Sequence, residues 1–98
     1  MTFVDTILSY SPQTLFSFAG LITYRPDPIL IHTIKTLPLD LMLIETDCPY
    51  LTPSAFKGQE NQPAYVGEIA KKIAEIKDCP VEWVQSKTTE NAIRFFGL

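Results

Sequence analysis

The sequence has few of the residues on which several common kinds of site depend. It contains one histidine and two cysteines, with no Cys-x-x-Cys pair, so it cannot build a zinc site of the cysteine–histidine type by itself. The formal net charge is −3, and Lys71 and Lys72 are the only adjacent basic residues. Because binding to a phosphate backbone depends on clustered Lys and Arg, the sequence argues against nucleic-acid binding by charge alone.

Long apolar runs and secretion signals are also missing. No segment approaches the roughly 20 apolar residues of a membrane span, and the first ten residues lack the basic start and apolar run of a signal peptide. The two cysteines do not form a disulfide framework. These absences predict a cytoplasmic protein with reduced thiols and no membrane partner.

The composition is that of one small folded domain. The chain has 98 residues, of which 46% are hydrophobic and 19% are charged. This apolar content can fill a core, and the chain does not have the composition of a disordered protein.

The first half of the chain predicts a strand, a helix and a second strand. Aromatic and β-branched residues favour a strand over 15–24, with Gly20 at a bulge or a close backbone approach. Asp27 as N-cap and Pro28 as first residue begin a helix that ends before Pro38. Residues 41–46, which begin with four apolar side chains, predict the second strand. This order is the unit that builds parallel sheets.

The second half predicts helices. Apolar residues at helical spacing favour a helix over 64–76. Cys79–Glu82 predicts a further helix start with Pro80 at its first position, and a separate last helix is expected to begin near Thr88 or Thr89. Three aromatic side chains at helical spacing are predicted to lie in the core: Trp83, Phe95 and Phe96.

Two carboxylates lie at the end of the second predicted strand. Glu45 and Asp47 lead into a long loop with three prolines over 47–63, and loops of this length are usually functional. The end of a buried parallel strand is where α/β barrels keep their active sites. Asp47 follows a stretch too apolar to face water, so it must be paired, hydrogen-bonded or bound to a metal. The structural alternative is a strand-end Asp that caps local amides.

Two such strands cannot stand alone. Both are apolar almost throughout, which is typical of central strands that have neighbours on both sides. The chain therefore describes a slice of a larger sheet.

Several segments together resemble one family. Glu45–Pro53, followed by Gly58 and Asn61-Gln62-Pro63, resembles the C-terminal signature of the TatD family of metal-dependent hydrolases and deoxyribonucleases. Three other segments resemble that family's seventh strand, the approach to its last strand and its final helix: Ser17–Tyr24, Leu37–Asp40 and Thr89–Leu98. The resemblance covers residues 16–98, whereas residues 1–15 match poorly.

The resemblance implies an α/β fold. Residues 1–98 would form a single segment of a TIM (β/α)8 barrel of the metal-dependent hydrolase type, namely its last two strand–helix units plus C-terminal helices. It implies that Asp47 is a catalytic metal ligand at the end of strand eight, holding Mg²⁺, Mn²⁺ or Zn²⁺ and accepting a proton from metal-bound water.

Three further residues have two readings each. Glu45 either orients the metal ligands without binding the metal itself or forms a buried salt bridge. Tyr50 either stacks on a DNA base or packs at the rim. Asn61 has a possible functional role, in contacts with substrate or the loop. Its structural alternative is to hold the loop or to cap the following helix through its side chain.

The family's other ligands, a His-x-His pair, a Glu and two more His residues, lie upstream and have no counterpart here. His32 falls in a helix where the family places no ligand, and a full barrel needs about 250 residues. We therefore expect a fragment of an enzyme that cleaves DNA phosphodiester bonds, inactive alone. The alternative is a non-enzymatic fragment that complements an N-terminal half-barrel. A third hypothesis is another amidohydrolase, such as a deacylase, which would differ from the DNA-cleaving enzyme only in its substrate.

Overall fold

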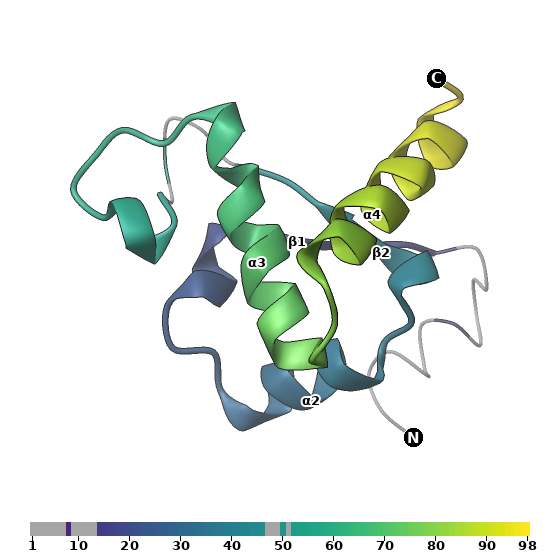
Figure 1. The fold of residues 1–98 in the computed structure, drawn as a ribbon, viewed down its shortest axis with the longest axis horizontal. Coiled ribbons are helices and arrows are strands. Elements are labelled where there is room, and N and C mark those ends of the chain that lie inside the picture. The colour runs from purple at the N-terminus through teal and green to yellow at the C-terminus, as the bar shows by residue number, and fades with distance from the viewer. Residues whose placement is uncertain (1–7, 9–13, 47–49, 51) are drawn as a thin grey trace.

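The computed structural model describes residues 8, 14–46, 50 and 52–98 (Figure 1). Within this part of the chain, the order is strand β1 (Phe16–Phe18), helix α2 (Pro28–Thr36), strand β2 (Met42–Ile44), and helices α3 (Val66–Lys77) and α4 (Val81–Phe96). Short 3-10 helices fill parts of the connections. None of the helices described is long and apolar enough to cross a membrane.

The two strands pair in parallel, as the strand–helix–strand order predicts. Phe16 lies opposite Met42, and Phe18 lies opposite Ile44. Each strand has three residues, so both are shorter than expected. Gly20, predicted at a bulge or a close backbone approach, begins a 3-10 helix (Gly20–Thr23). The Thr23 hydroxyl stabilises this turn by donating to the Gly20 carbonyl at 2.6 Å.

Helix α2 forms as its capping residues predict. The Asp27 carboxylate accepts a hydrogen bond from the backbone N–H of Leu30 at 2.8 Å. Pro28 occupies the first helical position, where its missing N–H costs nothing. The helix ends at Thr36, ahead of Pro38. Its residue His32 is exposed to solvent.

Helix α3 closely matches its predicted range, but α4 differs from the prediction of two helices. Residues 81–96 form one continuous helix, and Pro80 is its N-cap rather than its first residue. Thr88 lies in the middle, where its hydroxyl donates to the Val84 carbonyl at 2.7 Å. The hydroxyl is thus satisfied within the helix, so Thr88 does not end one helix and start another.

The core lies where α2, α3 and α4 meet the strands. Strand β2 and the three helices, with the residue that follows α2, all contribute fully buried apolar side chains to it: Ile34, Leu37, Met42, Ile69, Ile73 and Val84. Helix α3 lies against both α2 and α4, and α4 covers β2 (Figure 1).

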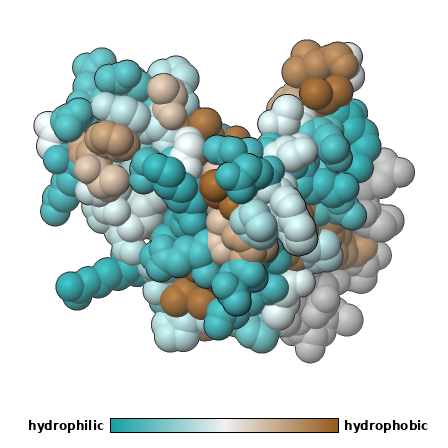
Figure 2. Space-filling view, in the orientation of Figure 1, coloured by the Kyte–Doolittle hydropathy of each residue, from teal (hydrophilic) through white to brown (hydrophobic). Residues whose placement is uncertain are grey.

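The prediction of core positions for three aromatic residues is wrong. Trp83, Phe95 and Phe96 are 63%, 56% and 64% exposed. The reason is the orientation of α4, whose buried face carries Val84, Thr88 and Asn91 at helical spacing. Trp83 is not part of this buried face, and the end of α4 forms an apolar tip on the surface (Figure 2).

Candidate active site at the end of strand β2

Glu45 begins the candidate site. It follows β2 directly, and its backbone N–H donates to the Phe18 carbonyl at 2.9 Å, which extends the parallel pairing by one residue. Its side chain is exposed, and the Oε2 atom accepts a hydrogen bond from the Ser17 hydroxyl at 2.8 Å. The bond fixes Glu45 at the carboxyl end of the two strands.

Ser17 is a residue whose role the sequence did not reveal. In the sequence it is only the first residue of Ser17–Tyr24, the segment that resembles the family's seventh strand. The available signal is that Ser17 is the one polar residue of β1, between Phe16 and Phe18. In the observed register Ser17 lies opposite Leu43, so its hydroxyl reaches the carboxylate two residues further along.

Asp47, the predicted catalytic metal ligand, lies outside the described residues, as does Cys48. The described chain resumes at Tyr50, whose side chain is 73% exposed. The Tyr50 ring is therefore accessible, and it does not pack into the core.

Asn61 closes the loop that follows. Its side-chain Nδ2 donates to the Tyr50 carbonyl at 2.6 Å, across eleven residues of chain. The residue is only 4% exposed, and its Oδ1 is buried with no hydrogen-bond partner in the part of the chain described. Asn61 thus holds the two ends of the loop together from inside.

The loop is also attached to the 3-10 helix that follows β1. The Tyr24 hydroxyl donates to the Thr52 carbonyl at 2.6 Å. The backbone N–H of Ser54 donates to the Thr23 hydroxyl at 2.8 Å, and the Ser54 hydroxyl donates to the Thr23 carbonyl at 2.7 Å. Segments that follow the two strands are therefore joined at the same end of the sheet.

Further contacts lie within the loop. Thr52 donates from its hydroxyl to the Gln59 carbonyl at 2.7 Å, and the rings of Phe56 and Tyr65 stack with centroids 4.1 Å apart. Gly58 has φ +95°, a conformation that favours glycine. The described part of the loop is thus an ordered structure with its own contacts.

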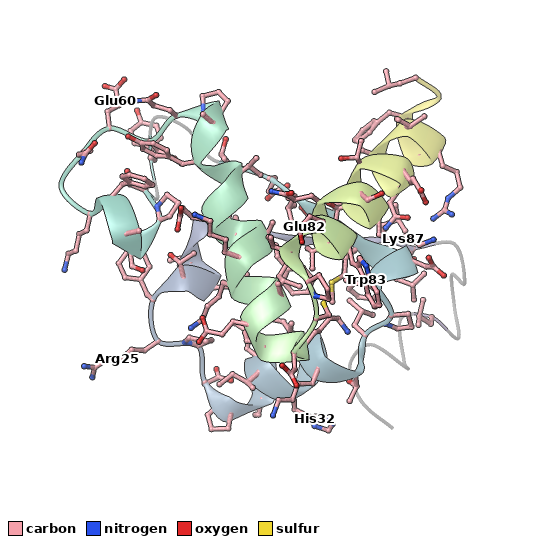
Figure 3. The ribbon with its side chains drawn as sticks, viewed as in Figure 1. Arg25, His32, Glu60, Glu82, Trp83 and Lys87 are labelled. Carbon is pink, nitrogen blue, oxygen red and sulfur yellow. The ribbon has the colours of Figure 1, made fainter. Side chains whose placement is uncertain are left out.

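The described residues do not form a metal-ligand set on their own. No group of three or more His, Cys, Asp or Glu side chains comes together among them. His32 lies on α2, at the opposite end of the molecule from Glu60 in the loop (Figure 3). A metal at the end of β2 would therefore need ligands beyond the described residues.

An ion pair whose two groups have shifted pKa values lies away from the site, just before β2 in the chain. Lys87 Nζ of α4 lies 2.7 Å from Asp40 Oδ1. Their hydrogen bond lowers the pKa of Asp40 and raises the pKa of Lys87. Both side chains are largely solvated, so the pair contributes little to stability.

Asn91 links α4 to β2 more strongly than the ion pair of Asp40 and Lys87 does. It is fully buried, and its Nδ2 donates to the carbonyls of Leu39 and Met42, each at 2.7 Å. Its Oδ1 accepts from the Arg94 guanidinium at 3.2 Å. Asn91 therefore positions the strand that leads to the candidate site.

Comparison with known families gives the chain its class. A family model described as TatD related DNase matches residues 3–97. The chain belongs to the TatD family. The match includes residues 3–15, which precede the segments that carry the sequence resemblance.

Curated relatives are metal-dependent hydrolases by name. The chain is 46% identical over 82 residues to the uncharacterized metal-dependent hydrolase YabD of Bacillus subtilis, covering 84% of this chain and 32% of YabD. It is 42% identical over 82 residues to the uncharacterized metal-dependent hydrolase YcfH of Escherichia coli, with 84% and 31% covered. The chain thus spans about a third of the length of these relatives.

Solved structures agree in fold. The TatD homologue YjjV from Escherichia coli superposes with a TM-score of 0.74 at 26% identity, over 86% of this chain and 32% of that one. A TatD-family hydrolase from Entamoeba histolytica has the same fold, with a TM-score of 0.71 at 21% identity, over 91% and 36% of the two chains. The fold prediction is confirmed: the chain is part of a TatD-type α/β barrel.

Proposed function

We propose that this chain is the segment of a TatD-family metal-dependent hydrolase that supplies Asp47 to an active site for cleaving phosphodiester bonds in DNA. The observation that carries the proposal is the Ser17–Glu45 hydrogen bond. It holds the start of the Glu45-Thr46-Asp47 run at the carboxyl end of two parallel strands, the end at which barrel enzymes place their chemistry.

The proposed roles follow from position. Asp47 contributes one ligand to a divalent ion, Mg²⁺, Mn²⁺ or Zn²⁺, whose other ligands come from outside the described residues. Glu45 and Ser17 orient the chain next to Asp47. The exposed ring of Tyr50 contacts DNA, and Asn61 keeps Tyr50 in place through its backbone carbonyl. The compartment we propose is the cytoplasm.

The test is a chimera that is covalently complete. The 82 aligned residues of the Bacillus subtilis relative are replaced by the matching residues of this chain, and hydrolysis of single- and double-stranded DNA is measured with each metal. We expect metal-dependent cleavage that Asp47→Asn lowers by at least about 100-fold, since a metal ligand is lost.

Two controls complete the experiment. Asp40→Asn changes a carboxylate on the other side of β2 and should leave the rate unchanged. The isolated 98-residue chain should be inactive with every metal. A folded chimera that cleaves DNA equally well with Asp47→Asn, or that cleaves no DNA, contradicts the proposal.

A further inference from the structure

Three alternate residues of the loop after β2 are each held by a hydrogen bond: Tyr50, Thr52 and Ser54. We call them the anchored residues. The first is held from within the loop, by Asn61. The other two are held from outside it, by side chains of the segment that follows β1. Pro53, which lies between these two, is fully buried, so packing fixes the chain there as well.

Tyr24 makes the first of the outside contacts. It is the C-cap of the 3-10 helix Gly20–Thr23, and its hydroxyl donates to the Thr52 carbonyl at 2.6 Å across 28 residues of chain. The residue is 36% exposed. Because only the hydroxyl distinguishes tyrosine from phenylalanine, this contact with the loop can be removed without changing the ring.

Thr23 makes the second outside contact. The backbone N–H of Ser54 donates to the Thr23 hydroxyl at 2.8 Å, and this hydroxyl donates in turn to the Gly20 carbonyl at 2.6 Å. Two hydrogen bonds in series therefore connect the backbone of the loop to the backbone of the turn after β1. The 3-10 helices Gly20–Thr23 and Ser54–Phe56 accordingly lie side by side (Figure 1).

The contact between Thr23 and Ser54 borders a polar cleft of about 280 Å³, which α3 lines with charged side chains. Hydrogen bonds that water can replace contribute little to stability. The value of the outside contacts is therefore in where they place the loop.

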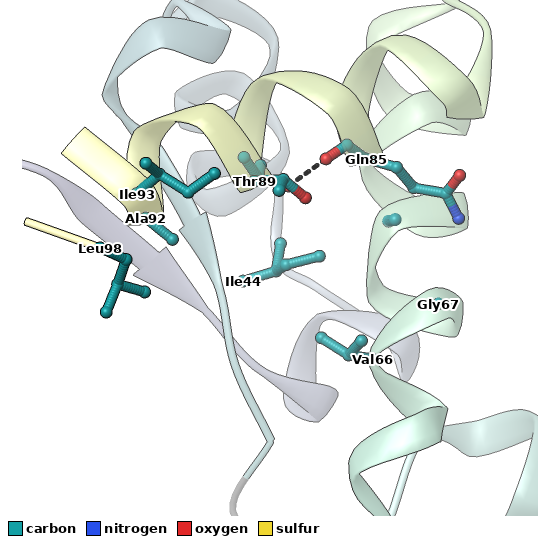
Figure 4. A pocket seen from close by; sticks show the side chains of 10 residues that line it. Ile44, Val66, Gly67, Gln85, Thr89, Ala92, Ile93 and Leu98 are labelled. Carbon is teal, nitrogen blue, oxygen red and sulfur yellow. Dashed lines mark hydrogen bonds between the residues drawn. The ribbon is translucent and has the colours of Figure 1, made fainter. Parts of the chain in front are cut away.

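The apolar pocket between α3 and α4 is not involved in these contacts. It has a volume of about 350 Å³, and Ile44 of β2 lines it together with residues of both helices (Figure 4). The described residues that line it include neither the anchored residues nor the side chains that hold them. The anchored residues are thus fixed independently of this pocket.

We propose that Tyr24 and Thr23 are positioning residues for DNA binding, which hold the anchored residues so that the exposed ring of Tyr50 is in place before the substrate arrives. The inference rests on the proposed function, in which Tyr50 contacts DNA. A segment that is already ordered loses less conformational freedom on binding than a free one. Because the contacts begin three residues after Asp47, we expect them to affect the affinity for DNA and not that for the metal.

The test uses Tyr24→Phe and Thr23→Val in the chimera. The dissociation constant Kd of a fluorescent single-stranded oligonucleotide is measured by anisotropy in EDTA, where no cleavage occurs. We expect each variant to raise Kd by about fivefold, because the freed residues must be ordered on binding, and to keep kcat within about twofold of the parent. Mn²⁺ affinity should be unchanged. In a Tyr50→Ala background neither substitution should weaken DNA binding further.

Each variant has a matched control. Tyr65→Phe also removes a phenolic hydroxyl, but this one donates to the exposed side chain of Gln59 at 3.1 Å, and Kd should be unchanged. Thr36→Val removes a hydroxyl that donates to the His32 carbonyl within α2, and it should also bind like the parent. Thr23→Ser keeps the hydroxyl and should restore binding.

Four results would overturn the inference. They are an unchanged Kd in both Tyr24→Phe and Thr23→Val, a lower kcat with Kd unchanged, a loss of Mn²⁺ affinity in these variants, and an undiminished rise in Kd in the Tyr50→Ala background. Circular dichroism of each variant verifies the fold.

The inference and the proposed function can fail separately, because binding is measured without cleavage. A chimera that cleaves no DNA but binds it more weakly with Tyr24→Phe overturns the enzymatic proposal alone. An active chimera whose Kd does not change with Tyr24→Phe and Thr23→Val overturns the positioning proposal alone. A chimera that neither binds nor cleaves DNA overturns both.

Discussion

Ser17 and Glu45 meet across the two parallel strands, with the serine hydroxyl donating to the carboxylate at 2.8 Å. Neither residue is buried, so the bond adds little to stability. Its effect is on position, because it joins β1 to Glu45, which precedes Asp47 by two residues. Glu45 is thereby oriented from both strands.

Removing this hydroxyl should therefore change activity more than stability. In the chimera, Ser17→Ala is expected to lower DNA hydrolysis by about tenfold, the usual cost of losing a residue that orients a metal ligand. Ser17→Thr keeps a hydroxyl and should restore much of the rate. Ser86→Ala, at an exposed serine of α4, is the control. Equal rates for Ser17→Ala and Ser86→Ala would show that the bond has no role in positioning.

Asn91 should be important for folding. Asn91→Ala leaves the carbonyls of Leu39 and Met42 without this donor, and we expect the free energy of unfolding in urea to fall by about 2–3 kcal/mol. Asn91→Asp should be as damaging, since a carboxylate cannot donate to carbonyls. Gln85→Ala, on the exposed side of the same helix, should cost little. A loss below about 0.5 kcal/mol for Asn91→Ala would contradict the structure.

The hydrogen bond of Asn61 should protect the loop from proteolysis. In Asn61→Ala the Tyr50 carbonyl loses its donor, so we expect trypsin to cleave after Lys57 at least about threefold faster through local opening. Glu60→Ala changes a neighbouring exposed residue and should behave like the parent. The cleavage rate is followed by mass spectrometry. No difference between the two variants would mean that other contacts hold the loop.

The pair formed by Asp40 and Lys87 makes a prediction about pH. Lys87 lowers the pKa of Asp40, so the contribution of this carboxylate is present above its unfolded pKa and is lost as the pH falls through the lowered value. For Lys87, whose pKa is raised, the contribution is present below its unfolded pKa and is lost as the pH rises through the raised value. Lys87→Met should raise the pKa of Asp40 in an NMR titration, whereas Lys71→Met should not. An unchanged value in Lys87→Met would rule out the pair.

The sequence was most informative where the signal is local. The N-cap Asp27 and the first-turn Pro28 were enough to place α2, and the strand–helix–strand order was enough to predict a parallel pair. These features depend on backbone chemistry within a few residues. The family signature around Glu45 was likewise readable, because it is contiguous in sequence.

Features that depend on distant contacts were not predictable. The Ser17–Glu45 bond requires the register of two strands 28 residues apart, and a one-residue shift would break it. The single helix α4 and the exposure of Trp83, Phe95 and Phe96 depend on which side of that helix meets β2. Helical spacing alone does not distinguish a core-facing side from a side left open.

The central claim is that the residues after β2 hold a divalent metal through Asp47. The most direct measurement is Mn²⁺ binding to the chimera, followed by electron paramagnetic resonance, with Asp47→Asn compared to Asp40→Asn. We predict that Asp47→Asn weakens binding by at least about tenfold while Asp40→Asn binds like the parent. Equal affinity in the two variants would contradict the claim.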